Sequence, residues 1–187
     1  MRRIIFSMSM SLDGYIEGPE RQIDWHMVDE ELHQHFNDTL RRMGAFIDGR
    51  VTHELMASFW PTADQDPANA GTMAEFAAIW REMPKIVYSR TLERADWNTT
   101  IEREIDPDAV RALKERPGGD LALGGSQLAA AFAAHDLIDA YRIYVHPVLI
   151  GRGKPLFPPA DALARLRLTE TRTFGNGVVM LSYDRHR

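Results

Sequence analysis

The chain has 187 residues, a length typical of one domain, and its 22 basic and 27 acidic side chains give a formal net charge of -5. It contains no cysteine, which excludes disulfides, thiolate catalysis and cysteine-ligated metal sites and suits a reducing cytoplasm. No basic stripe typical of nucleic-acid binding is present, and no run approaches the roughly 18 apolar residues of a membrane span, so neither partner is expected.

The first segment, "RRIIFSMSMS" (2–11), predicts a buried strand that ends at the turn former Asp13-Gly14. Its apolar run is too interrupted for a signal peptide. Residues 15–25 predict a loop. A helix over about 27–43 follows from apolar residues at spacings of 4, 4, 4 and 3, namely Val28, Leu32, Phe36, Leu40 and Met43.

The middle of the chain alternates between short apolar runs and amphipathic segments. Strands are predicted at 45–49, 85–89 and 99–104, and helices at 50–60 and 72–83, with a loop over 61–71. A further helix over 106–119 begins with Asp106 as N-cap and Pro107 in its first turn.

The last third predicts a strand, a helix, a strand and a hairpin. The strand "DLALGG" precedes a helix beginning "SQLAAAF", and a strand follows over 140–150. Two alternating runs, 166–174 and 178–184, are joined by Gly175-Asn176-Gly177, which is typical of a β-hairpin.

This order of elements predicts one three-layer α/β/α domain over residues 1–187, with a mostly parallel central sheet and an antiparallel C-terminal hairpin. Ligands of such sheets bind outside the carboxyl ends of the strands. Functional residues are therefore expected where strands end.

Three of these strand ends offer groups that attract anions. Gly49-Arg50 and Gly124-Gly125 each precede a helix, whose free N–H groups and dipole favour negative charge. Ser89-Arg90 adds a hydroxyl and a guanidinium. Together they suit a pyrophosphate and one further phosphate, the charge pattern of NADPH. Taken alone, Gly124-Gly125 is as well explained by a tight turn.

Five segments resemble the dihydrofolate reductase superfamily, and within it the reductase domain of riboflavin biosynthesis and its stand-alone bacterial relatives. In family order they are "MSLDGYI" (10–16), "DGRVTHE" (48–54), "KIVYSRTL" (85–92), "LALGGSQLAAAF" (121–132) and "YRIYVHPVLIGRGKPLF" (141–157). The resemblance implies a homodimer, in contact through 141–153 or the final hairpin. It also implies NADPH-dependent reduction of a pterin or a ribosylated aminopyrimidine such as 5-amino-6-(5-phosphoribosylamino)uracil.

The resemblance also assigns roles to individual residues. The residues implied to contact the cofactor phosphates are Gly49, Arg50, Val51 and Thr52, and those implied to select the 2′-phosphate are Ser89 and Arg90. The residues implied to hold the pyrophosphate are Gly124, Gly125, Ser126, Gln127 and Leu128. Ser9 and Met10 are implied to contact the nicotinamide. Asp13 matches the acidic position of the "SLDG" motif.

Candidates for catalysis and substrate binding lie between residues 13 and 31. The proton that follows the hydride could come from water or from Asp13. Glu30 is a candidate pterin-binding carboxylate, although Asp29 and Glu31 are as close in sequence, and acids in a first helical turn also simply suit the dipole. Trp25 is the candidate to stack on a flat substrate.

No metal site is expected. His26, Glu30 and His33 could share one helix face, but a solvated polar face explains the spacing as well, and "HELMA" (53–57) lacks the second histidine of a zinc-protease helix. Two other functions stay open. The protein could bind NADPH without turnover, or it could be an interaction module whose glycines are only turns.

Overall fold

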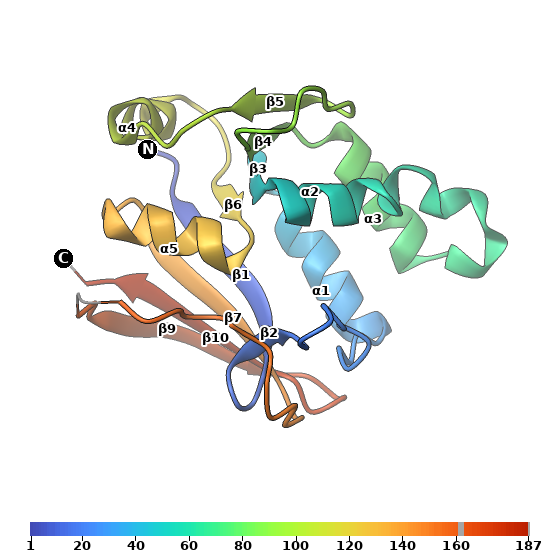
Figure 1. Ribbon diagram of the computed structural model, residues 1–187. Helices are drawn as coiled ribbons and strands as arrows, with labels where there is room; N and C mark the ends of the chain where they lie inside the picture. Colours follow the sequence, from blue (N-terminus) through green and yellow to red (C-terminus); the bar gives the residue numbers. More distant parts are fainter. Residues whose placement is uncertain (161–162, 187) are drawn as a thin grey trace.

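The computed structural model describes residues 1–160 and 163–186. Its central sheet has eight strands and runs through the middle of the molecule (Figure 1). The strand order is β5-β4-β3-β6-β1-β7-β10-β9. The strands span, in chain order, β1 Ile4–Ser11, β3 Ala45–Gly49, β4 Lys85–Tyr88, β5 Thr99–Glu102, β6 Leu121–Leu123, β7 Ala140–His146, β9 Leu166–Thr173 and β10 Val179–Arg185.

Six neighbouring strands of this sheet, from β5 to β7, run parallel, and β10 pairs antiparallel with both β7 and β9. The predicted sheet with its antiparallel C-terminal hairpin is confirmed. Gly175-Asn176-Gly177 forms the hairpin turn, where Phe174 N donates to Val178 O at 2.9 Å. The expected alternation of burial along β9 is wrong, because this edge strand is exposed at every position.

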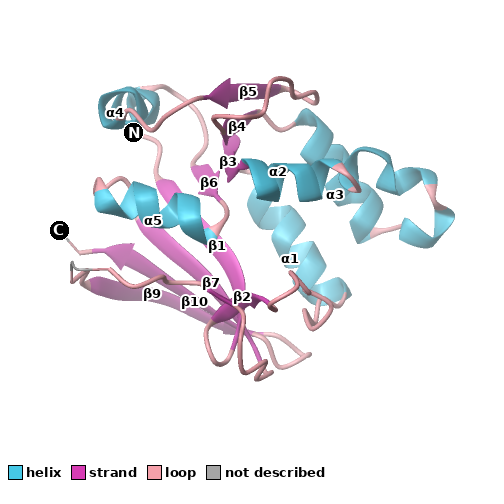
Figure 2. Cartoon of the chain, viewed as in Figure 1, coloured by secondary structure: helices cyan, strands magenta, loops and turns pink. Residues whose placement is uncertain are grey.

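Helices cover both faces of the sheet, as Figure 2 shows. The α-helices are α1 Glu30–Leu40, α2 Arg50–Ala57, α3 Thr72–Glu82, α4 Pro107–Glu115 and α5 Ser126–Ala134. One core cluster joins α4 and α5 to the sheet through Val110, Ala129 and Phe132. Clusters on the other face join α1 through Leu32 and α3 through Phe76 and Trp80. The predicted three layers are therefore present, and their apolar contacts hold the strand ends in place.

Several predicted boundaries shift. The helix expected from residue 27 begins at Glu30, because the Asp29 side chain caps it by accepting from Leu32 N at 2.9 Å. Val28 stays outside the helix and is 44% exposed. The strand expected over 140–150 ends at His146, and the helix expected over 106–119 ends at Glu115.

Four short elements were not predicted. The 15–25 segment contributes a strand, β2 Tyr15–Glu17, which pairs with β8 Lys154–Pro155. The segment expected to be a loop over 61–71 forms two 3-10 helices, η1 Trp60–Gln65 and η2 Pro67–Asn69. In the part of the chain that the structure describes, no helix is long and apolar enough to cross a membrane.

Candidate functional site

The carboxyl ends of the parallel strands meet at one edge of the sheet. They carry the three groups of residues predicted to bind phosphates. The register pairs Ile47 of β3 with Leu123 of β6, and Gly49 with Tyr88 of β4. The helix starts at Gly49 and Gly125 are thus neighbours, and Ser89-Arg90 follows on the next strand. The structure brings the three predicted groups of residues together.

The two helices that start here lack side-chain caps. Asp29 and Asp106 cap α1 and α4, whereas α2 begins after Gly49 and α5 after Gly125 with no side-chain hydrogen bond to the first turn. Uncapped N–H groups at a helix start are available to an anion. The chain therefore places two such starts side by side at the carboxyl ends of its parallel strands.

Close packing requires both glycines at the start of α5. A Cβ on Gly125, whose φ is +82°, would stand 3.0 Å from Thr52 Oγ1, and a Cβ on Gly124 would stand 2.5 Å from Asp48 Oδ1. Because neither glycine has a side chain, the start of α5 can pack closely against Thr52 of α2 and Asp48 of β3. Ser126 is only 2% exposed while Gln127 is exposed, so the start of α5 is most accessible at Gln127.

A cavity of about 430 Å³ lies beyond the glycine pair. Its lining combines three residues predicted to bind the cofactor with four others: Tyr88, Ser89, Arg90, Arg103, Glu104, Ile105 and Leu128. The Ser89 hydroxyl oxygen accepts from the N–H groups of Thr91 and Leu92 at 3.2 and 2.9 Å. Its own hydrogen therefore stays available to an oxygen in the cavity, beside the exposed Arg90.

Arg103 also lines this cavity but is not among the residues predicted above. Its guanidinium donates to the carbonyls of Ser89 and Leu92 at 3.0 and 2.6 Å, which fixes the Ser89-Arg90 turn. No sequence motif marks it, because its role depends on where β5 leaves the sheet. Arg50, by contrast, forms an exposed ion pair with Glu54 one turn along α2, at 2.8 Å, and Val51 is 39% exposed.

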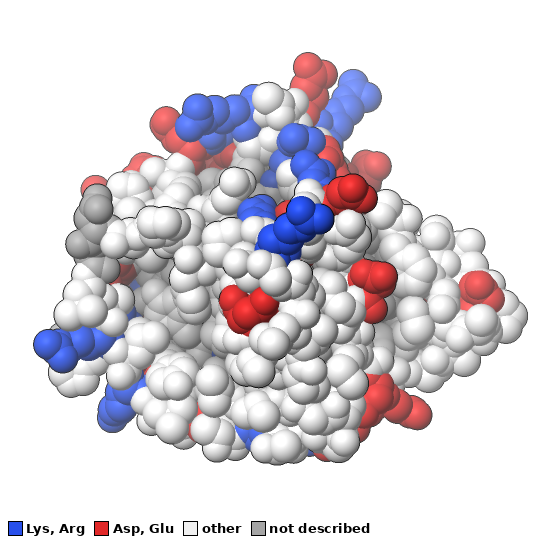
Figure 3. All heavy atoms as spheres, turned by 60° about the horizontal axis from the view of Figure 1, so that its bottom comes forward, with Lys and Arg blue, Asp and Glu red and all other residues white. Residues whose placement is uncertain are grey.

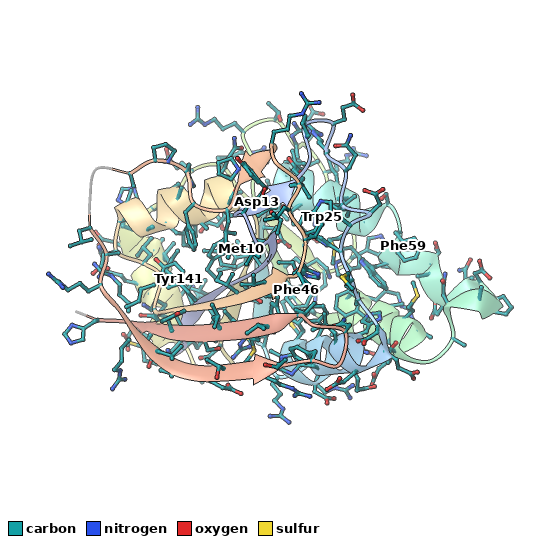
Figure 4. All side chains as sticks on the ribbon, turned by 90° about the horizontal axis from the view of Figure 1, so that it is seen from below. Met10, Asp13, Trp25, Phe46, Phe59 and Tyr141 are labelled. Atoms are coloured by element: carbon teal, nitrogen blue, oxygen red, sulfur yellow. The ribbon has the colours of Figure 1, made fainter. Side chains whose placement is uncertain are left out.

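The end of β1 extends past β6, because Phe6 already pairs with Leu123, the last residue of β6. Ser9 and Met10 therefore lie beyond the β6 end, and they pair with Tyr144 and Val145 of β7. Figure 4 labels Met10, Asp13 and Trp25, which all lie near the middle of the view from below. The predicted nicotinamide contacts thus share this edge with the glycine pair.

Asp13 holds a loop. Its carboxylate accepts from the N–H groups of Ile150 and Gly151 at 3.2 and 2.7 Å. Hydrogen bonds, foremost from the Ser11 side chain and then from Gly151 and Ile150, lower the pKa of Asp13 below its usual value. The carboxylate is ionised at neutral pH and has no proton to give, so a role as general acid stays a prediction that its surroundings disfavour.

Trp25 packs on a pair of stacked histidines. The rings of His26 and His146 are 5.1 Å apart and nearly parallel, and Trp25 meets them edge-on at 4.2 and 5.7 Å. His146 is fully buried at the end of β7, opposite Ser11. Its Nδ1 accepts from Met27 N at 3.0 Å, so the neutral ring carries its proton on Nε2. The sequence analysis named Trp25 but not this pair.

Acid should destabilise the fold through His146. Burial, followed by His26, lowers the pKa of His146 from 6.5 to about 4. In the unfolded chain His146 is therefore protonated below pH 6.5, whereas in the folded chain it is protonated only below about pH 4. We expect His146 to cost about 3 kcal/mol of unfolding free energy between these two values, as measured by urea denaturation at a series of pH values.

His146→Asn is the matched variant, because the amide oxygen can accept from Met27 N and does not titrate. Its unfolding free energy should fall less steeply with acid than that of the wild type. Parallel pH profiles for the two proteins would contradict this expectation.

The three acids at the start of α1 have separate environments. Asp29 caps the helix, and Glu31 accepts from Gly175 N at 3.0 Å and pairs with Arg172 at 3.3 Å. Hydrogen bonding to Gly175 is the main cause that lowers the pKa of Glu31. Glu30 is exposed in the first helical turn, and its assignment as a catalytic residue stays a prediction.

The histidines weighed as metal ligands lie apart. His26 stands before α1 and stacks on His146, whereas His33 contacts Trp60 and Phe76. His26 lies outside the helix and His33 is half-buried on α1, so the two histidines do not share one helix face with Glu30. Within residues 1–160 and 163–186, no group of three or more His, Cys, Asp or Glu side chains is placed to hold a metal.

Charge on the lower face is mixed. Figure 3 shows basic and acidic side chains close together along its upper margin, and most of the remaining visible surface is uncharged. An anion bound at the sheet edge would therefore rely on the local groups described above rather than on a broad basic surface.

The strand order and the layers give this chain the fold of dihydrofolate reductase, with two uncapped helix starts and an adjoining cavity at the strand ends. A family model described as the RibD C-terminal domain matches residues 2–180, so the chain belongs to this family.

The chain is also similar to individual proteins along its full length. It is 34% identical over 183 residues to the uncharacterized protein YyaP of Bacillus subtilis, covering 97% of this chain and 94% of that protein. A putative riboflavin biosynthesis protein from Shewanella sp. PV-4 superposes with a TM-score of 0.75 at 22% identity, covering 100% of both chains. Dihydrofolate reductase from Enterococcus faecalis, solved with NADP(H), superposes with a TM-score of 0.66 at 14% identity, covering 99% and 97%.

Proposed function

We propose that this protein is an NADPH-dependent reductase that transfers a hydride to a C=N or C=O bond of a planar heterocycle or its sugar. The observation that carries the proposal is the meeting of two uncapped helix starts with the cavity that holds Ser89, Arg90 and Leu128. This arrangement suits a ligand with a pyrophosphate and one further phosphate.

The shape of the sheet edge at the start of α5 supports the binding of a dinucleotide. Gly124 and Gly125 present bare backbone in close contact with Asp48 and Thr52, so the pyrophosphate can lie against the start of α5. The 2′-phosphate would receive the Ser89 hydroxyl and the Arg90 guanidinium. When bound, NADPH supplies the hydride; Met10 and Ser9 hold the nicotinamide end, and water supplies the proton, since Asp13 is ionised.

Family membership supports the substrate class and the setting. We infer a pterin-like or ribosylaminopyrimidine-like substrate beside Trp25, in a cytoplasmic enzyme. A homodimer is inferred through the exposed edge strand β9, where Leu166 and Leu168 are 39% and 52% exposed.

Titration with NADPH, followed by nicotinamide fluorescence, tests the cofactor assignment. The wild type should bind NADPH, and Gly125→Val should lose at least about tenfold in affinity, because the added side chain is strained at positive φ and presses on Thr52, which displaces the start of α5. Equal affinities of the wild type and this variant would contradict the assignment.

Turnover is a separate question. Oxidation of NADPH is measured with a panel of pterin and ribosylaminopyrimidine substrates, and substrate-dependent consumption is the expected result. NADPH binding without consumption for any member of the panel would favour the alternative of a binding protein without turnover.

A further inference from the structure

Asp48 is a buried acid directly beneath the glycine pair. It precedes Gly49 at the end of β3 and is 8% exposed. Its Oδ1 lies 2.5 Å from the position that a Gly124 Cβ would take, so the carboxyl group touches the bare backbone at the start of α5. Asp48 is the first residue of the "DGRVTHE" segment, but the sequence analysis assigns it no role.

Little in its surroundings offsets a negative charge on Asp48. Among the described residues, no hydrogen bond or ion pair engages its carboxyl group. The cation that acts on it is Lys85 of β4, whose ammonium group donates to Met83 O and Trp97 O at 2.8 Å each and lies 4.2 Å from the Trp80 ring. Burial raises the pKa of Asp48 to about 7, with Lys85 acting in the opposite direction.

Each element packed around Asp48 contributes few other charges. From α2 come His53, buried with an unpartnered Nδ1, and the exposed Arg50–Glu54 pair. Burial, followed by Lys85, lowers the pKa of His53, so it stays neutral near pH 7. On α3, Arg81 is paired with Asp64. The end of β6 and the first turn of α5 bring glycine, serine and glutamine, which do not titrate.

We propose that Asp48 is a proton-linked positioning residue of the cofactor seat, which must be neutral when a pyrophosphate binds at the start of α5. The inference rests on the proposed function. A neutral carboxyl group can donate a hydrogen bond to a phosphate oxygen, whereas a carboxylate would repel it at short range in a poorly solvated place. The arriving anion therefore makes Asp48 take up one proton from solvent.

The affinity of the wild type should fall as pH rises from 6.5 to 8.5. Asp48→Asn keeps the shape of the side chain but cannot ionise, so its affinity should be nearly independent of pH and about tenfold above that of the wild type at pH 8. The probes are NADPH and ADP-ribose, because the pyrophosphate of ADP-ribose does not ionise further in this range. Both dissociation constants are measured by isothermal titration calorimetry.

Glu54→Gln is the matched control, since it removes an exposed negative charge from the same region. This variant should keep the pH dependence of the wild type. A pH dependence that survives in Asp48→Asn, or that disappears in Glu54→Gln, would overturn the inference.

Proton uptake tests the inference without any variant. The binding enthalpy of ADP-ribose at pH 7.5 is compared in buffers with different heats of ionisation, and uptake of up to one proton by the wild type is expected. No uptake would overturn the role of Asp48 and leave the cofactor assignment intact. Failure of both NADPH and ADP-ribose to bind the wild type would overturn the proposed function and this inference together.

Discussion

Lys114→Ala is expected to lower the free energy of unfolding by about 3–5 kcal/mol, the usual cost of breaking a buried ion pair. Lys114 of α4 and Asp139 before β7 are 6% and 9% exposed, and their charged atoms are 2.7 Å apart. Asp139 also accepts from Ile4 N at 2.9 Å, so the pair joins α4 to the first strand. Urea denaturation at neutral pH measures the loss.

Two comparisons separate this effect from a loss of packing. Arg111→Ala removes an exposed ion pair with Asp108 on the same helix and should change stability little. The double variant Lys114→Met with Asp139→Asn removes both charges but keeps an acceptor for Ile4 N, so it should recover most of the stability. A double variant as unstable as Lys114→Ala would show that the loss of the buried ion pair is not the cause.

Arg90→Ala is expected to reduce NADPH affinity by about 10- to 100-fold while leaving NADH affinity unchanged, because charge-assisted hydrogen bonds to phosphate are worth about 1.5–3 kcal/mol. Arg90 is exposed at the cavity beside Ser89, where the 2′-phosphate is proposed to bind. Only NADPH carries that group. Parallel titrations with both cofactors measure the change in selectivity.

Arg94→Ala is the matched control, since Arg94 is an exposed arginine four residues further on that does not line the cavity. It should keep the selectivity of the wild type. An Arg90→Ala protein that still prefers NADPH would remove the proposed role of Ser89-Arg90.

Periodicity and turn residues were enough to predict the layers of this fold. Alternating strands and helices, followed by a hairpin turn at Gly175-Asn176-Gly177, gave the mostly parallel sheet and its antiparallel end. Boundaries were less predictable where a cap overrode periodicity. Val28 continues the apolar stripe, yet the helix begins at Glu30 because Asp29 caps it.

Glycine and charge patterns picked out three groups of residues that lie together in the structure, because a parallel sheet brings successive strand ends to one edge. They could not reveal Asp48, Lys85 or the His26–His146 pair. Asp48, Lys85 and His146 lie in segments that resemble the family, but each is buried by elements distant in sequence, so the pattern alone did not indicate their contacts. The same holds for Arg103, whose side chain reaches the Ser89-Arg90 turn only after β5 has paired with β4.

The bonds around Asp13 have a mechanical consequence. The Asp13 carboxylate accepts from the N–H groups of Ile150 and Gly151. Nearby, Leu12 N donates to Val148 O at 2.8 Å and Leu156 N donates to Gly14 O at 2.9 Å. Strand β2 also pairs with β8. Segments 12–17 and 148–156 therefore form one hydrogen-bonded unit, which follows the adjacent ends of β1 and β7. A displacement of either segment must therefore carry the other with it.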